Sequence, residues 1–379
     1  NDFIYPDDYS ESMQTYLNYT GQTDAGGRKF GTNTDADGRF HSRWLNMMYP
    51  RLYLARNLLR EDGVVFISID DNEVDNLCKI CNEVFGEENF IGSCVVQTNP
   101  KGRVLDKYLS RTHDYLIIYS RGDQLEELSM PKSDSEVAAD YPAEDERGRF
   151  RALELRNTHR QFGRHNRPNL WYPLYATEDN GAVLLEWREG TVEIWPLWDD
   201  GFEGCWTWSS AKVRMQKDDL FARNINGRWR VFRKAYSHDA DGAVARKKTK
   251  TILMDRTFST EKGQKAFDEL FGERGIFQSP KPVHLIKLAL SMSTGDADIV
   301  LDFFAGSGTT AQAVLELNEE DGGNRKFILV QLPEPTGRDD YPMISDMCKE
   351  RVRRAIKNLD HDAPKESSLF ADSRPEQDC

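Results

Sequence analysis

The sequence predicts an α/β protein in which two α/β segments flank a β-rich insert. Short apolar runs alternate with helical patterns in the first 121 residues and again after residue 257, the order expected of a doubly wound, mostly parallel sheet. Residues 147–256 instead show short strands and turns and contain seven of the eight tryptophans. A chain of 379 residues with 39% hydrophobic residues is long and apolar enough for two domains.

The first segment contains a predicted helix, strand and helix in succession. Residues 1–40 are polar and show no period, so we expect a loop there. Apolar residues recur at helical spacing over 42–60, and 64–69 is a continuous apolar run typical of a buried parallel strand. A helix is predicted over 72–85 and another strand over 115–119.

A helical pattern resumes after residue 257 and leads to a strand at 298–301, a Gly-x-Gly turn and a helix. Such a turn brings bare backbone N–H groups to a helix N-terminus, where a small polar cofactor can bind. No lysine follows Gly308, as a Walker phosphate loop requires, and Ala311 takes the place of the third glycine of a dinucleotide fingerprint, an accepted variant. The turn alone is equally compatible with a dinucleotide and with another adenosyl cofactor.

These patterns predict four segments. Residues 1–121 and 257–360 form two halves of one domain, 122–256 form an inserted domain, and 361–379 form a disordered tail. The net charge is −13, yet Lys and Arg outnumber Asp and Glu over residues 147–256, whereas residues 122–146 are acidic and linker-like. This asymmetry indicates a basic module on an acidic body, although a solvated surface would explain it equally well.

The cysteines and the hydropathy indicate a cytoplasmic protein. Of six cysteines only Cys78 and Cys81 are close, and their helical spacing favours a packed, reduced pair over a zinc site. We therefore expect no metal. No run approaches the ~18 apolar residues of a membrane span, and no signal peptide opens the chain.

Three blocks around the glycine turn carry a family resemblance. They are FQSPKPVHLIKLAL (277–290), VLDFFAGSGTT (300–310) and RKFILVQLPEP (325–335). In this order they resemble the cofactor half of a permuted amino-methyltransferase that uses S-adenosylmethionine. The closest resemblance is to the modification subunit of type III restriction systems, which methylates the exocyclic amine of adenine in DNA, and it covers roughly residues 1–357. It implies a circularly permuted Rossmann-like methyltransferase sheet with an inserted β-rich target-recognition domain.

The resemblance also implies a set of cofactor contacts. Gly306 and Gly308 would let the backbone approach the methionine end of the cofactor, and Lys281 would pair with its carboxylate. Gln331 stands where many relatives carry an acidic residue for the ribose hydroxyls, and Glu334 is the alternative. The complete predicted set is Phe277, Ser279, Lys281, Asp302, Phe303, Ala305, Gly306, Gly308, Thr309, Thr310, Gln331 and Glu334.

The family depends on an Asp-Pro-Pro-Tyr loop, whose acidic side chain and proline carbonyl accept the N–H hydrogens of the target amine. That loop is not in this sequence. NDFIYPDDY, at the start of the chain, resembles the segment that follows the loop in relatives, so we expect the chain to begin just past it. Asn99, His113 and Asp70 are the candidates for the base pocket, with ordinary structural roles as the alternative.

The expected partners are duplex DNA, a second copy of the chain and a helicase-nuclease restriction subunit, the last two by resemblance only. The predicted phosphate contacts are Arg149, Arg151, Arg156, Arg246, Lys247, Lys248 and Lys250. Three alternatives stay open at this point: a cytosine amino-methyltransferase, a DNA-binding module without catalysis, and a dinucleotide oxidoreductase. The SPKP segment and the permuted order oppose the last.

Overall fold

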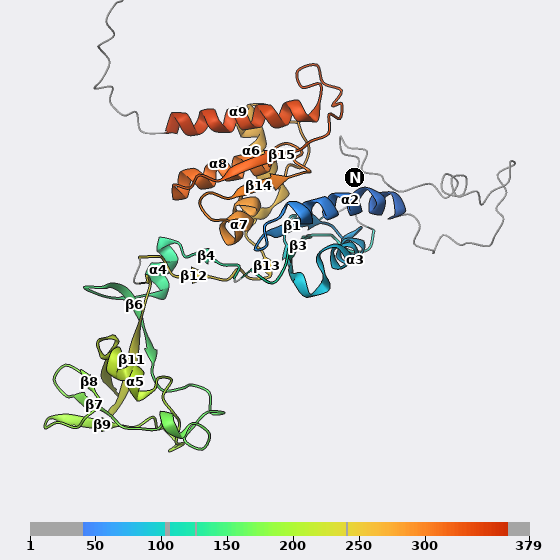
Figure 1. The fold of residues 1–379 in the computed structure, drawn as a ribbon. Helices are drawn as coiled ribbons and strands as arrows, with labels where there is room; N and C mark the ends of the chain where they lie inside the picture. The colour runs from blue at the N-terminus through green and yellow to red at the C-terminus, as the bar shows by residue number, and fades with distance from the viewer. Residues whose placement is uncertain (1–40, 103–106, 126, 240–241, 363–379) are drawn as a thin grey trace, which may run out of the picture. The chain divides into compact units, whose positions relative to one another are not determined.

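A computed structural model describes residues 41–102, 107–125, 127–239 and 242–362 (Figure 1). The chain divides into two compact units. Unit 1 comprises Asn1–Met130 and Lys248–Cys379, and unit 2 comprises Pro131–Lys247, whereas the sequence predicted an insert of 122–256. The predicted N-terminal loop and most of the predicted tail lie outside the described residues.

The larger sheet of unit 1 has the strand order β1-β3-β2-β13. Its strands are β1 (Val64–Ile69), β3 (Asp114–Ser120), β2 (Phe90–Val96) and β13 (Ile252–Leu253). β3 runs antiparallel to β1 and β2, and only β13 pairs in parallel, with β2. The expectation of a mostly parallel sheet is therefore wrong for these strands. The continuous apolar run of β1 reflects helices packed on both of its faces, which does not depend on strand direction.

Helices cover the two faces of this sheet. α2 (Ser42–Leu58) and α3 (Val74–Phe85) pack on one face, where Leu52 and Leu77 are buried against β1 and β3. α7 (Val283–Ser293) packs on the other face, where Leu285 contacts the alternate side chains of β1, β2 and β3. The fold class predicted from the sequence, α/β, is confirmed.

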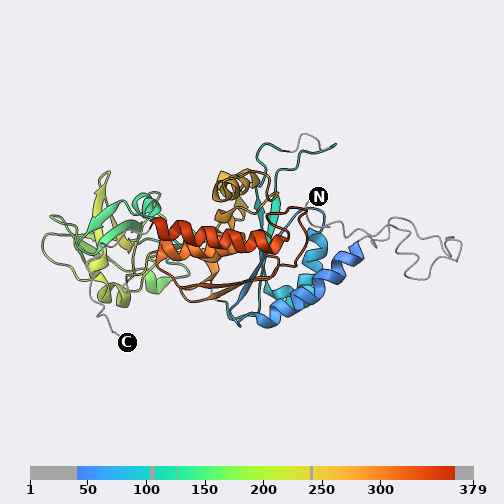
Figure 2. The ribbon, with the colours of Figure 1, turned by 90° about the horizontal axis from the view of Figure 1, so that it is seen from above.

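A second sheet of unit 1 consists of the parallel strands β14 (Ile299–Asp302) and β15 (Lys326–Leu329). The crossover between them is α8 (Thr309–Asp321), which packs with α7 on one face of the pair. α6 (Thr260–Phe271) and α9 (Ile344–Asp362) share a further apolar cluster. Both views place α9 alongside α8 (Figures 1 and 2).

α7 is common to both sheets, because its side chains join the apolar clusters of β1 and of β14. At the start of these strands, Arg60 forms an ion pair with Asp298 at 2.6 Å. At the other end of β1, Lys281, which precedes α7, contacts Asp114. Among the described strands, β1 pairs only with β3, and β14 pairs only with β15.

Unit 2 contains a sheet of order β10-β11-β6-β5 and a sheet of order β8-β7-β9. Their strands are β5 (Ala143–Asp145), β6 (Gly148–Glu154), β7 (Leu174–Thr177), β8 (Val183–Leu184), β9 (Thr191–Ile194), β10 (Leu220–Ile225) and β11 (Arg228–Tyr236). One apolar cluster joins both sheets to α5 (Ser210–Met215). Trp206 and Trp208 are buried in this cluster, so these two tryptophans belong to the core, as the sequence predicted for the tryptophans of the insert.

The remaining elements are short. They are β4 (Met130–Pro131), α4 (Asp134–Asp140), β12 (Arg246–Lys247), and the 3₁₀ turns η2 (Glu87–Asn89), η3 (Pro168–Leu170), η4 (Lys217–Asp219) and η5 (Arg256–Phe258). Ser133 caps α4 in a complete capping box with Glu136.

We expect Trp206→Phe to destabilise unit 2 by about 2–4 kcal/mol, because the side chain is 1% exposed and its indole N–H donates to the Tyr172 carbonyl at 2.8 Å. Urea unfolding followed by circular dichroism measures this change. Trp187→Phe is the matched control, since Trp187 is 66% exposed. Equal effects of the two substitutions would contradict the assignment of Trp206 to the core.

Candidate functional site

The glycine turn after β14 requires both of its glycines. Gly306 and Gly308 have φ values of 52° and 81°, in the left-handed region that favours glycine. A Cβ at Gly308 would also lie 3.0 Å from the Cys348 Sγ of α9. Gly308 is the N-cap of α8 and offers no side-chain cap, so the first turn of the helix presents backbone N–H groups.

Hydrogen bonds to the side chains of Gln331 and Asp302 hold the backbone of this turn. The Gly306 N–H donates to Gln331 Oε1 at 2.7 Å. Asp302 accepts from the Phe304 N–H at 3.0 Å and from the Thr310 hydroxyl at 2.6 Å. The ring of Phe303 lies 5.2 Å from that of Phe304, and Ala305 is buried. The backbone of the turn is thus held in place without a ligand.

Gln331 and Glu334 lie together beyond the end of β15. The Gln331 amide nitrogen donates to Glu334 Oε2 at 3.2 Å, while its amide oxygen accepts from Gly306. The two residues that the sequence offered as alternatives for one role are therefore hydrogen-bonded to each other. Gln331 supports the turn, and the carboxylate of Glu334 stands next to it.

Arg351 of α9 holds the turn from the protein interior, and this residue was not predicted from the sequence. Its guanidinium donates to the hydroxyls of Ser307 and Thr309 at 2.8 and 2.7 Å. The Thr309 side chain, a predicted cofactor contact, is accordingly directed into the protein interior and is 6% exposed. The signal in the sequence was a cation at position 351 on the helix face that also carries Ile344 and Met347, which are buried.

The SPKP segment is held by α6. Ser279 has a φ of 53°, which is rare for a residue with a side chain. Gln264 donates to the Phe277 carbonyl at 2.9 Å and accepts from the Ser279 N–H at 3.0 Å. A Cβ at Gly263 would lie 2.4 Å from the Pro280 carbonyl oxygen, so α6 packs directly on this segment. Neither Gly263 nor Gln264 was predicted from the sequence.

Phe277 and Lys281 have different environments. Phe277 is 5% exposed and packs 5.9 Å from the ring of Phe267. Lys281 is 46% exposed and lies 3.3 Å from Asp114. An ion pair this exposed contributes little to stability, so the ammonium group can exchange one carboxylate partner for another.

The three base-pocket candidates lie at one end of the larger sheet, where β1 and β2 end and β3 begins. His113 Nε2 is 3.2 Å from the Tyr115 hydroxyl. Burial, together with a hydrogen bond to Asp71, raises the pKa of Tyr115. Asn99 donates its N–H to the Thr112 carbonyl at 3.0 Å. These contacts place the imidazole and the phenol side by side.

Asp70 makes local contacts at this end of the sheet. It accepts from the backbone and the side chain of Asn72, at 3.0 and 2.9 Å, in the turn that precedes α3. Both carboxylate oxygens thus have a partner within the turn.

Metal ligands do not gather in the described part of the chain, where no cluster of three or more His, Cys, Asp or Glu could hold an ion. Cys78 and Cys81 are free thiols. Cys81 is completely buried, and burial raises its pKa to about 12. No helix among these residues is long and apolar enough to span a membrane.

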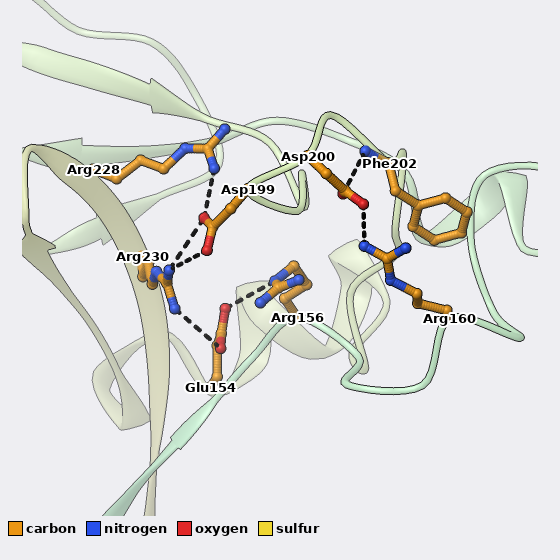
Figure 3. Close-up of polar contacts among 8 residues, drawn as sticks. All are labelled: Glu154, Arg156, Arg160, Asp199, Asp200, Phe202, Arg228 and Arg230. Carbon is orange, nitrogen blue, oxygen red and sulfur yellow. Dashed lines mark hydrogen bonds and ion pairs between the residues drawn. The ribbon is translucent and has the colours of Figure 1, made fainter.

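Most predicted phosphate contacts in unit 2 are engaged by carboxylates or rings. Arg156 donates to Glu154 at 2.8 Å and stacks 4.1 Å from the Trp198 ring centroid. Figure 3 shows the same pattern nearby: Arg160 bonds Asp200, and Arg228 and Arg230 converge on Asp199. The other predicted contacts with partners of this kind are Arg149 with Glu144, Arg151 over Tyr141, and Lys247 with Glu136.

Other cations are available in unit 2. Lys212, Arg214 and Lys217, on α5 and just after it, are exposed and form no ion pair with any residue that the structure describes. They were not predicted from the sequence. The Lys212 ammonium lies 4.6 Å from the Trp208 ring centroid. In unit 1, Lys248 lies 3.8 Å from Glu127, whereas Lys250 is exposed without an ion pair among the described residues.

Known proteins resemble the chain over most of its length. The EcoPI Mod subunit, a type III restriction-modification enzyme of Escherichia phage P1, is 34% identical over 94% of this chain and 56% of its own length. The Klebsiella pneumoniae type II methyltransferase M.KpnI is 34% identical over 84% of this chain and 75% of its own. The StyLTI Mod subunit of Salmonella typhimurium is 30% identical over 97% of this chain and 53% of its own.

The chain thus spans about half the length of the two Mod subunits. A putative DNA modification methylase of Thermus thermophilus, complexed with S-adenosyl-L-methionine, aligns at a TM-score of 0.38 with 11% identity, over 86% of this chain and 83% of that one. That score is too low to match individual site residues. The predicted resemblance to type III modification subunits is confirmed by the Mod relatives.

A family model described as DNA methylase, of the N6/N4 methyltransferase type, matches residues 18–354. That range includes the glycine turn, the SPKP segment and the whole of unit 2. The chain therefore belongs to the N6/N4 DNA methylase family.

Proposed function

We propose that this chain binds S-adenosylmethionine at its glycine turn and takes part in methylating the exocyclic amine of adenine in duplex DNA, within a restriction-modification system. The observation that carries the proposal is the turn itself, because Gly306 and Gly308 adopt conformations that expose backbone at the N-terminus of α8. The amine of cytosine is the alternative acceptor within the same family.

The residues around the turn are compatible with such a cofactor. The absence of a side chain at Gly306 leaves room for the methionine end, whereas a side chain at Gly308 would meet Cys348 of α9. Lys281 offers a cation for the carboxylate of the cofactor. Glu334 provides a carboxylate for the ribose hydroxyls, whereas the Gln331 oxygen is already bonded to the turn. When bound, S-adenosylmethionine supplies an electrophilic methyl group on a sulfonium centre.

The end of the larger sheet where Asn99 and His113 lie is proposed to hold the target base. A base must leave the duplex to reach an enclosed pocket, where side chains hydrogen-bond its edge and stack on its face. Asn99 and His113 stand at the end of the sheet that also holds Asp114, the partner of Lys281. The chain's contribution there is to orient the base, since positioning accounts for much of the barrier reduction in an in-line displacement.

Unit 2 is proposed as the DNA-recognition module. Exposed cations without carboxylate partners are the best phosphate contacts, because a cation that is already paired must first lose its carboxylate. We accordingly assign this role to Lys212, Arg214 and Lys217 together with Lys250 of unit 1, ahead of Arg156. A second copy of the chain and a restriction subunit are the proposed protein partners, supported by the likeness to Mod subunits.

Calorimetric titration tests the cofactor site. We expect S-adenosylmethionine to bind in the micromolar range, Lys281→Ala to weaken binding by about tenfold, and Gly306→Val to abolish it, because valine does not tolerate the φ of 52°. Lys101→Ala is the matched control, since Lys101 forms an exposed ion pair with Glu261. A folded wild-type protein that does not bind the cofactor would contradict the proposal.

The ribose contact can be tested separately. We expect Glu334→Gln to weaken S-adenosylmethionine binding about tenfold through loss of a charged acceptor. The same change should have less effect on the binding of an analogue that lacks the ribose hydroxyls. Gln331→Glu should also lose affinity, since an added carboxylate would sit beside Glu334 and repel it. A gain in affinity with Gln331→Glu would instead assign the ribose to position 331.

DNA binding is tested by fluorescence anisotropy with a labelled duplex. We expect the double substitution Arg214→Ala, Lys217→Ala to weaken binding and to reduce the slope of log affinity against log salt by about 2, in proportion to the lost phosphate contacts. Arg164→Ala, which removes a cation paired with Glu203 at 3.0 Å, should change the slope less. The reverse ranking would show that the paired arginines contact DNA.

A further inference from the structure

Arg351 is the most deeply buried cation in the described part of the chain, with 0% of its surface exposed. Its Nε donates to Gln312 at 2.8 Å, and its Nη1 donates to both Ser307 and Thr309. The Phe267 ring centroid lies 5.3 Å from the guanidinium carbon. The three hydrogen bonds all end on the turn or on the first turn of α8.

The charge of Arg351 is poorly compensated where it stands. No carboxylate among the described residues forms an ion pair with it, and its Nη2 has no hydrogen-bond partner. Desolvation lowers its pKa to about 10. The main compensating charge is that of Glu316, which accepts a hydrogen bond from the Arg351 partner Gln312 at 2.8 Å and acts to raise the pKa of Arg351. The N-terminus of α8, next to it, carries the positive end of the helix dipole, which disfavours a nearby cation. If the side chain served only to fill the core, an apolar side chain of similar volume would do so without the desolvation penalty of a buried charge.

The positions of the hydrogen-bond acceptors of Arg351 indicate why a buried guanidinium is present here. Ser307 lies between the two glycines of the turn, and Thr309 follows the second. Gly306 and Gly308 leave the backbone between them with the greatest conformational freedom. Arg351 donates from the protein interior to the hydroxyls on either side of Gly308 and so restricts that freedom. Gln331 and Asp302 restrict it further through their own hydrogen bonds to Gly306 and Thr310.

We propose that Arg351 is a positioning residue for cofactor binding: from α9 it locks Ser307 and Thr309, and so presets the backbone N–H groups of the glycine turn. The residue touches no ligand itself. The role rests on the proposed binding of S-adenosylmethionine at this turn, but the preorganisation of the turn is a property of the free protein.

Arg354 provides a matched control on the same helix. It lies 4.7 Å from the Phe271 ring centroid, and its guanidinium donates to the Phe271 carbonyl at 2.6 Å, at the end of α6. Its Nε also pairs with Glu350 at 2.7 Å. Arg354→Ala therefore removes a guanidinium that ties α9 to α6 without touching the turn. Both substitutions should lower the thermal midpoint of unfolding.

The first measurement is calorimetric titration of S-adenosylmethionine into Arg351→Ala and Arg354→Ala. We expect Arg351→Ala to weaken binding at least tenfold and Arg354→Ala to leave it within about twofold. Methylguanidinium, at a concentration that does not denature the protein, should restore part of the affinity of Arg351→Ala only. Unchanged affinity in Arg351→Ala, or equal losses in both variants, would overturn the proposal.

The second measurement does not depend on the cofactor. Hydrogen–deuterium exchange of a peptide covering residues 303–312 should accelerate in Arg351→Ala without ligand and stay unchanged in Arg354→Ala. If the wild-type protein binds no S-adenosylmethionine, the proposed function fails while this result still decides whether Arg351 orders the turn. Equal exchange in the wild type and Arg351→Ala would overturn the positioning role. The two failures are therefore distinguishable.

Discussion

The packing of α7 across two separate sheets is the constraint on which the site depends. Its side chains are shared between the cluster around β1 and β3 and the cluster around β14 and α8. The residues that precede α7 include Lys281, which reaches Asp114 at the start of β3. One apolar helix thus fixes the distance between the glycine turn and the end of the sheet where His113 lies.

Around the glycine turn, side chains bind to backbone and to one another from three directions. Gln331 comes from the end of β15, Arg351 comes from α9, and Asp302 precedes the turn itself. Each satisfies polar groups that would otherwise require water. What stays open is the backbone, so the turn is ordered before any ligand arrives and little entropy is lost on binding.

Periodicity and turn chemistry were enough to predict α2, α3, α6, α8, β1, β3 and the glycine turn, whereas α9 was not predicted. Strand direction was not predictable, because an apolar run such as that of β1 records burial on both faces and not the direction of its neighbour. Arg351 and Gln264 were missed, since their partners lie 42 and 15 residues away and no local pattern connects them. The same holds for Arg160 and Arg164 of unit 2, whose carboxylate partners Asp200 and Glu203 lie 40 and 39 residues away.

Among the described strands, β1 and β14 each pair along one edge only, and this has a consequence for how the protein behaves in solution. An unpaired edge presents a row of backbone N–H and C=O groups to any extended chain, and the β14–β15 pair adds apolar side chains, with Ile299 64% and Ile328 52% exposed. Such edges are templates for strand addition between molecules. An extended segment that paired with either edge would add a strand to its sheet without unfolding either unit.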